Sequence, residues 1–577
     1  MSRMSAEDAI RLYGEAKGNR TPHEDDWRKA AAYCLPQQYA SWQTEGRPIN
    51  PASAASTVRR TVYDSTGARS LPKYVAILER LATPAAMKWH TLTASDESLR
   101  RHKRVRDYFE QLRDLMFRMR YHPRARFRIA SSEVYQSLGV YGNGPIYIGE
   151  RKATSVSRDP GIKYIACPIR DTFVIVDDDG EVYGVFRRFW LNVRQFRLKF
   201  PNVAMPTTMA AEAKKPTPSE NEYFEFVHFV VVRDEKSYDP SAIDQRRHPW
   251  SGSYICCSSK EYVGDETGYA SMPYKVPRTA SVPGDVYGFS PAVTALASMG
   301  GASAMKKINL KQGNKAVDPP LLAHDESVMN GEVDLRPGAI NYGGVSRDGK
   351  LLIQPLRGGD FRVGEVLLQD ERRDIEDSFF VTLFQILTET PEMTATEVME
   401  RVAEKAALLS PTMGRIQSEF LGPTIEREID VLNELGLLPE MPPELVEAQG
   451  EYEVVYTSPL AKSMYAEEVS GFMRSVETSL NIAQATQDMS ALDHYNFDVA
   501  IPEMADYMAV PSRWMASLDD IKAKREARTQ QAETQQMIDA APAAVGAAAT
   551  GAAVAGNLNN VPAGFDAEGF QRIAKMI

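Results

Sequence analysis

A segment rich in glycine and proline, between two segments with helical periodicity, constrains the fold of this chain more than any other feature. Residues 290–316 carry apolar residues at three- and four-residue spacing, and Ser290-Pro291 places proline in the first helical turn. Residues 318–360 set short apolar stretches among turn sequences such as Asp318-Pro-Pro. The helical period returns at 361–388. We therefore expect two helices with a small, turn-rich β module inserted between them.

In the rest of the first half of the chain, the spacing of apolar residues changes once, from a helical period to a strand period. Four segments before residue 140 have helical spacing: Ser5–Cys34, Asp64–Leu81, Asp96–Met119 and Arg126–Leu138. From 145 to about 275 the period is close to two, which predicts an antiparallel β region. Within it Asp177-Asp-Asp-Gly180 is typical of a hairpin turn, because the spacing of a calcium-binding loop is missing. The chain is predicted to be α+β and mainly helical.

After residue 388 the pattern is mostly helical again. Thr394-x-x-Glu397 is a capping box that begins a long helix, in which Pro411 and Gly422-Pro423 predict a kink or a break. A short strand at 452–456 follows, and then helices near 462–484, 497–508 and 513–538. The tail from 540 is rich in alanine and glycine, and we expect it to be flexible unless a partner covers it.

Composition excludes several classes of protein. The apolar runs are much shorter than the roughly 20 residues of a membrane-spanning helix, and the N-terminal sequence does not resemble a signal peptide. Four cysteines in 577 residues cannot form a disulfide framework, which favours a reducing compartment. The net charge of −10 argues against binding nucleic acid by broad phosphate neutralisation, but it is compatible with DNA sliding past the protein.

No catalytic signature is present. The sequence lacks a Walker phosphate loop, an H-E-x-x-H zinc motif, a paired C-x-x-C and a nucleophile elbow, so we expect no enzyme activity. The eight histidines show no metal-ligand spacing, and no metal or cofactor is predicted. His228 lies on an apolar strand, where a histidine is more often part of the core or of an interface than a metal ligand.

Two features of residues 290–316 are candidates for function. Gly300 and Gly301 lie in mid-helix, where each costs about 1 kcal/mol relative to alanine, so close approach of another backbone is the expected compensation. Lys307, Lys311 and Lys315 share one helix face, with Lys306 beside them. Three interpretations stay open for this lysine stripe: a solvated face, a band of positive charge around a central axis, or ion pairs with acidic residues at 370–377 of a neighbouring copy.

The order of these segments resembles the portal, or head-to-tail connecting, proteins of short-tailed bacteriophages. The likeness extends over roughly residues 7–540. The segments that carry it most clearly are Asp64-Ser-Thr-Gly-Ala-Arg-Ser-Leu, Leu81-Ala-Thr-Pro-Ala-Ala-Met-Lys-Trp-His, Tyr287-Gly-Phe-Ser-Pro, Pro391-Glu-Met-Thr-Ala-Thr-Glu-Val-Met-Glu-Arg, and Gly414-Arg415 through Leu438-Pro439. None of these is a catalytic motif, and their collective order is what is specific.

The resemblance implies a division of the chain into the parts of a portal subunit. These are a wing (1–288), a first stem helix (289–317), a clip (318–360), a second stem helix (361–388), a tunnel loop (389–396), a long kinked wing helix (397–439), a helical crown (440–539) and the Ala/Gly-rich tail (540–577). The tunnel loop contains Thr390, Pro391, Glu392, Met393 and Thr394.

The resemblance also implies partners and a location. Portal subunits form a ring of about twelve copies at one capsid vertex, through which double-stranded DNA is packaged, retained and ejected. The expected partners are this DNA, the terminase motor, capsid and scaffolding proteins, the tail adaptor and, as further candidates, internal core proteins. The protein would be made in the host bacterial cytoplasm and become part of the virion. A monomeric scaffold or adaptor protein of the virion is the alternative.

Overall fold

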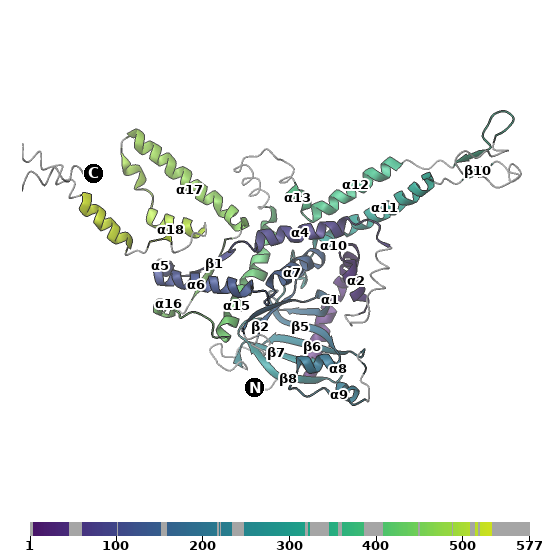
Figure 1. Cartoon of the computed structure of the whole chain (residues 1–577), viewed down its shortest axis with the longest axis horizontal. Helices are drawn as coiled ribbons and strands as arrows, with labels where there is room; N and C mark the ends of the chain where they lie inside the picture. The colour runs from purple at the N-terminus through teal and green to yellow at the C-terminus, as the bar shows by residue number, and fades with distance from the viewer. Residues whose placement is uncertain are drawn as a thin grey trace, which may run out of the picture.

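The protein has a mixed body of helices and sheets from which helices project on two sides (Figure 1). The computed structural model describes residues 4–44, 61–100, 102–151, 159–215, 219, 221–233, 247–317, 321–323, 345–355, 361–385, 408–447, 451–457, 459–486, 488–507, 514–516 and 520–532. A pair of helices extends from the body at one end of the molecule, and the C-terminal helices lie at the other.

Helices from the first 141 residues, together with one short helix at 291–294, form the centre of the body. They are α1 (Ala6–Cys34), α2 (Pro36–Gln43), α4 (Thr66–Ala82), α5 (Glu97–Arg100), α6 (Lys103–Arg120), α7 (Phe127–Tyr141) and α10 (Pro291–Thr294). Ser5 caps α1, because its hydroxyl accepts a hydrogen bond from the Asp8 N–H at 3.1 Å. Trp27, Tyr74 and Tyr135 are almost completely buried among these helices, so the predicted helical periodicity corresponds to a real core.

The predicted β region forms two antiparallel sheets. The larger has the order β4-β5-β6-β7-β8, from Thr172–Val176, Val182–Leu191, Phe224–Val232, Trp250–Cys256 and Glu261–Tyr269. The smaller has the order β3-β2-β9, from Gly161–Ala166, Ile146–Arg151 and Tyr274–Lys275. Helix α1 packs on one face of the larger sheet, and α8 (Val193–Lys199) and α9 (Thr207–Ala213) pack on the other.

Two local predictions in the β region are confirmed. Gly180 has φ +82° in the turn between β4 and β5, where the Asp177 carboxylate accepts a hydrogen bond from the Glu181 N–H. His228 is buried, its Nδ1 lies 2.6 Å from the Tyr274 hydroxyl, and its ring stacks on Tyr254. It is therefore a core histidine.

The segment 408–434 is helical throughout, although Pro411 and Pro423 within it predicted a kink or a break. A π-helix (η5, Ile416–Leu421) leads directly into α15 (Gly422–Glu434). Pro423 has no N–H to donate into the preceding turn, and the wider π turn accommodates it. The Tyr456 hydroxyl donates a hydrogen bond to the Gln417 carbonyl in this π turn, at 3.1 Å.

The C-terminal third returns to the body through one strand. Strand β12 (Tyr452–Tyr456) pairs antiparallel with β1 (His90–Ala94). The strand predicted at the start of the C-terminal helical region therefore forms a sheet with a strand of the N-terminal region. The remaining elements are α16 (Pro443–Glu447), α17 (Pro459–Thr486), a 3-10 turn (η6, Met489–Leu492), α18 (Phe497–Tyr507) and a helix at 520–532.

A buried charged cluster fastens α15 to the body. Arg120 on α6 donates through Nε to the Glu428 carboxylate on α15 at 2.9 Å, and both side chains are completely buried. His90 Nε2 lies 2.9 Å from the other side of the guanidinium, and the Tyr164 hydroxyl donates to Glu428 at 2.6 Å. Side chains from β1, α6, β3 and α15 therefore meet at one ion pair.

Candidate functional site: the helical hairpin

The two helices that flank the Gly/Pro-rich segment pack side by side and extend away from the body (Figure 1). They are α11 (Leu296–Val317) and α12 (Phe361–Ser378). The predicted second helix was longer, to residue 388; α12 ends at Ser378, and α13 (Val381–Gln385) follows. Phe380 between them has φ +57°, and Phe379 is fully buried against Tyr74. Packing of these rings ends the helix where local periodicity would continue it.

Small residues bring α11 and α12 close together. A Cβ atom added at Gly301 would lie 3.0 Å from Oε1 of Glu371, and one added at Gly364 would lie only 2.5 Å from Oδ1 of Asn309. These two contacts also define the antiparallel register of the hairpin. Gly300 faces a different neighbour, because its added Cβ would lie 3.8 Å from the Tyr33 hydroxyl, at ordinary contact distance. Sequence reasoning overlooked Gly364, although a glycine inside a predicted helix was the available signal.

Ion pairs fix the base of the hairpin to α4 and to Asp64 just before it. Arg372 pairs with Asp64 at 2.6 Å, and Lys73 lies 3.7 Å from Glu376. Burial opposes ionisation of Asp64, but hydrogen bonds from Thr66 and Arg372 outweigh it and lower the pKa of this carboxyl. Part of the polar segment 370–377 is therefore held in ion pairs with the body.

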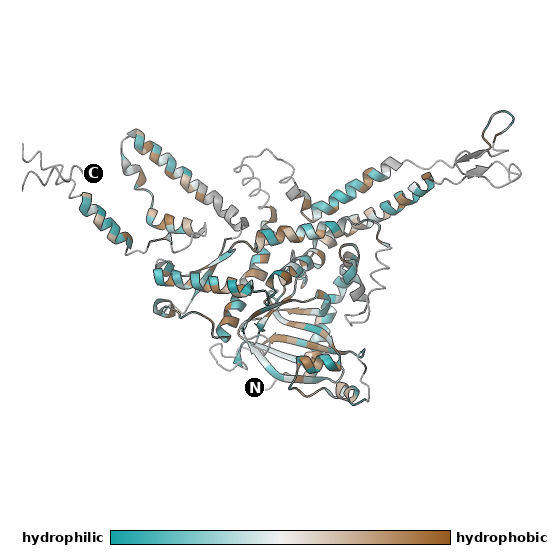
Figure 2. Ribbon diagram, in the orientation of Figure 1, coloured by the Kyte–Doolittle hydropathy of each residue, from teal (hydrophilic) through white to brown (hydrophobic). Residues whose placement is uncertain are grey.

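The lysine stripe lies on the side of α11 that is turned away from α12. Lys307, Lys311 and Lys315 are all exposed, and the Lys307 Nζ lies 5.4 Å from the centre of the Tyr63 ring. Figure 2 shows polar residues along the outer part of this helix. Since Asn309 is opposite Gly364, Lys311 is level with the first turn of α12, about 12 Å along the axis from Asp370 at 1.5 Å per residue.

The described part of the tip is a small β element. Strand β10 (Leu321–Ala323) pairs antiparallel with β11 (Ile353–Pro355), and a turn at 346–349 places Gly349 at φ +77°. The rest of 318–360 lies outside the described residues, as do the predicted tunnel-loop residues Thr390, Pro391, Glu392, Met393 and Thr394.

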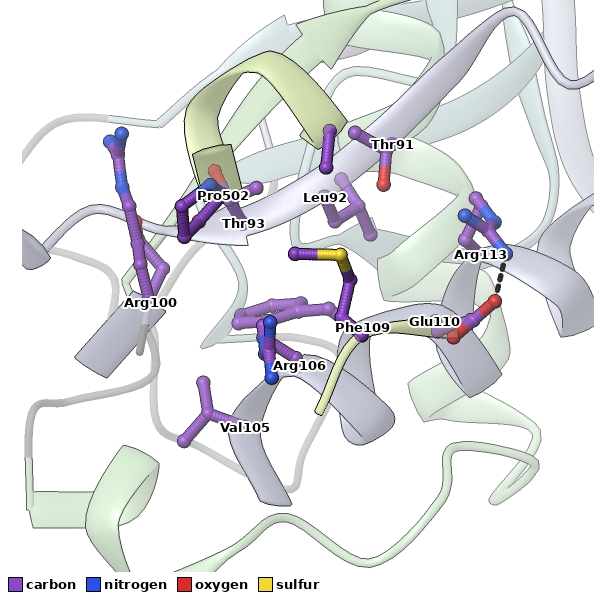
Figure 3. A pocket seen from close by; sticks show the side chains of 13 residues that line it. Thr91, Leu92, Thr93, Arg100, Val105, Arg106, Phe109, Glu110, Arg113 and Pro502 are labelled. Atoms are coloured by element: carbon purple, nitrogen blue, oxygen red, sulfur yellow. Dashed lines mark hydrogen bonds and ion pairs between the residues drawn. The ribbon is translucent and has the colours of Figure 1, made fainter. Parts of the chain in front are cut away.

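A cavity elsewhere in the chain is too small for a typical cofactor. It lies where β1, α6 and α18 meet, and it is lined by side chains that include Arg100, Arg106, Phe109 and Pro502 (Figure 3). Its volume is about 60 Å³, against roughly 300 Å³ or more for typical ligand pockets. Among the described residues, no group of acidic, histidine or cysteine side chains has an arrangement that could hold a metal ion. None of the helices within the described ranges is long and apolar enough to cross a membrane.

Comparison with known proteins gives the family. The sequence model of "Bacteriophage head to tail connecting protein" matches residues 6–515. A "Probable portal protein" of Bordetella phage BPP-1 is 25% identical over 91% of this chain and 91% of its own length. A "Portal protein" of Salmonella phage epsilon15 is 23% identical over 95% of this chain and 96% of its own.

Among solved structures, a chain of "Neck of empty GTA particle computed with C6 symmetry" is 12% identical, with a TM-score of 0.34; the match covers 72% of this chain and 89% of that one. That structural likeness adds nothing to the assignment. The match to the family model and the two portal proteins confirm the resemblance noted in the sequence, and this chain belongs to the bacteriophage head to tail connecting protein family.

Proposed function

We propose that this protein is a phage portal protein, a structural subunit without enzyme activity. About twelve copies form a ring at one capsid vertex, and double-stranded DNA passes through its centre during packaging and ejection. The ring also retains the packaged DNA and joins the head to the tail. The protein is made in the cytoplasm of the host bacterium and becomes part of the virion. Family membership supports this proposal.

The single observation that carries the proposal is the projecting hairpin. Helices α11 and α12 leave the body together, pack through small residues and end in a β element. Repeated around an axis, such hairpins form a tube with the β elements at one end. A monomeric adaptor has no need of a hairpin that exposes so much of its surface.

We assign the parts of the subunit from the resemblance to portal proteins. The stem is 289–317 with 361–388, the clip is 318–360, the tunnel loop is 389–396, the wing is 1–288 with 397–439, and the crown is 440–539 with the tail 540–577 beyond it. Strand β12 lies on the crown side of the boundary at 440 and pairs with β1 on the wing side, so wing and crown share one small sheet.

The lysine stripe is proposed to face DNA in the channel. Lys307, Lys311 and Lys315 are exposed on the side of α11 opposite α12, and a ring would repeat them as bands of positive charge. Duplex DNA carries one negative charge per ~1.7 Å, so local bands in a protein of net charge −10 bind it weakly without trapping it.

The clip is proposed to bind the terminase motor during packaging and the tail adaptor afterwards, because it is the exposed end of the stem. Capsid and scaffolding proteins are further proposed partners, and internal core proteins are candidates.

Mass and shape of the purified protein test the proposal. Twelve copies of 64.3 kDa give about 772 kDa, which native mass spectrometry measures directly, and class averages from electron microscopy show whether the particle is a ring with a central opening. A folded protein that stays monomeric or dimeric at micromolar concentration contradicts the portal assignment and favours the monomeric scaffold or adaptor.

A further inference from the structure

One side of the stem hairpin carries two exposed apolar residues that nothing in the described chain covers. Ile308 on α11 is 53% exposed and Leu367 on α12 is 45% exposed. Each comes directly before a buried residue that faces the other helix, Asn309 or Leu368. Two antiparallel helices are related by a pseudo-two-fold axis perpendicular to the plane of the hairpin, so equivalent positions lie on the same side of it. We call this side, defined by Ile308 and Leu367, the first side.

The opposite side of the hairpin is different. Near the base it is occupied by the body, through Arg372 with Asp64 and Glu376 with Lys73. Farther out it exposes Leu310, which is 48% exposed and lies about 160° around α11 from Ile308. We call this side, defined by Leu310 and the contacts with α4, the second side.

The two sides also differ in charge. Asp374 is exposed and lies two helical turns after Leu367, on the first side. Arg373 is exposed and points away from α11, three residues before Glu376 of the second side and three residues after Asp370. Arg373 has an ion-pair contact of 3.9 Å with Asp370 on the surface, whereas within the described ranges the Asp374 carboxylate has no ion-pair partner. One hairpin therefore offers a carboxylate on the first side and a guanidinium on the outer face of α12, between the two sides.

We propose that the first side of each hairpin binds the next copy of this chain, against the exposed outer part of its second side and against its outward-pointing Arg373. Asp374 pairs with Arg373 of the next copy, and Ile308 with Leu367 packs near Leu310 of that copy. This inference rests on the proposed ring, for which it names the contact surface within the stem.

Geometry and charge support a second copy as the occupant. The two surfaces are unlike, so the contact is heterologous and propagates around a ring instead of stopping at a dimer. Arg373 and Asp374 are consecutive residues that differ by only about 1.5 Å in height along the helix, so adjacent copies related by rotation hold them at nearly the same level. Lys307 and Lys311 lie between the two sides and stay free for DNA, whereas Lys315, seven residues after Ile308, lies beside the first side.

Charge reversal tests the proposal. We expect Arg373→Glu and Asp374→Lys each to raise the subunit concentration for half-assembly by about tenfold or more, because each places like charges in contact. The double variant R373E/D374K restores opposite charges at every contact, and its assembly returns toward wild type. Lys17→Glu and Asp178→Lys change charge at exposed positions outside the hairpin and serve as controls.

Mixing the two single variants gives a sharper result. The glutamate introduced by R373E meets the lysine introduced by D374K, and the unchanged Asp374 of the first variant meets the unchanged Arg373 of the second. An equal mixture therefore forms rings of alternating copies at a subunit concentration at which neither variant assembles alone.

Three outcomes overturn the proposal. Recovery that stops at pairs of subunits indicates a two-fold contact, and single variants that assemble like wild type show that the two charges do not meet. A mixture and a double variant that both stay unassembled show that the charges act elsewhere. A wild-type protein that forms no ring overturns the proposed function instead.

Discussion

At the scale of single residues, we expect a large loss of stability when the Arg120–Glu428 ion pair is broken. Both side chains are completely buried, so removing one charge leaves the other without compensation in the core. We expect Glu428→Gln to lower the free energy of unfolding by about 3–5 kcal/mol. Denaturant titration measures this loss. Asp498→Asn breaks the exposed pair with Arg525 and is the matched control, with an expected loss below about 1 kcal/mol. Equal effects of the two changes contradict this account.

Two buried histidines predict a pH dependence of stability. Burial lowers the pKa of both His90 and His228 below the ordinary value of about 6.5, and nearby cations such as Arg120 and Lys199 lower them further. Below about pH 6.5 the unfolded chain therefore binds more protons than the folded chain, and stability falls as the pH decreases. We expect a lower melting temperature at pH 5.5 than at pH 7.5. His228→Asn reduces the difference and the exposed His102→Asn leaves it unchanged; an unchanged difference in the first variant counts against the assignment.

The sequence allowed some of these buried residues to be predicted, but not the buried ion pairs. His228 follows from the apolar strand around it, because a strand buried on both faces must bury its histidine. Arg120 and Glu428 look like ordinary charged residues on amphipathic helices, since nothing local marks a partner 308 residues away. Asp64 and Arg372 were missed for the same reason.

At the scale of secondary-structure elements, the glycines of the stem give a testable prediction. Leucine at Gly300 and Gly301 raises helix propensity, but at Gly301 it must displace Glu371, whose Oε1 lies 3.0 Å from the added Cβ position. We expect a cost of about 1–3 kcal/mol and impaired assembly. Leucine at Gly14 and Gly18 of α1 meets nothing within 4 Å and is the control. Normal assembly and packaging by the Gly300/Gly301 variant contradicts the close-packing role.

The boundaries of elements show where local pattern stops being informative. The helix–β–helix order around 318–360 was predictable, because period and turn residues change sharply there. The π-helix at 416–421 was not, because proline in a helical pattern signals disruption without specifying its form. The end of α12 at Ser378 depends on burial of Phe379 against α4, which periodicity does not reveal.

At the scale of the whole molecule, the lysine stripe separates effects on DNA from effects on assembly. We expect the change of Lys307, Lys311 and Lys315 to glutamine to leave ring formation intact but to lower the fraction of capsids that retain packaged DNA, because the bands of positive charge are lost. Nuclease protection of DNA in purified particles measures retention, and glutamine at Lys17, Lys103 and Lys214 is the control. Rings that fail to form point to a contact between copies, and unchanged packaging and retention show that the stripe is only a solvated surface.

The pairing of β1 with β12 has a consequence for synthesis on the ribosome. His90 pairs with Tyr456, and the chain between them takes roughly 20–70 s to make at 5–20 residues per second. During that time β1 lacks its partner strand β12, and a chain truncated before β12 never forms this pairing. A subunit therefore completes this sheet only after about four-fifths of the chain, up to Tyr456 of 577 residues, has been translated.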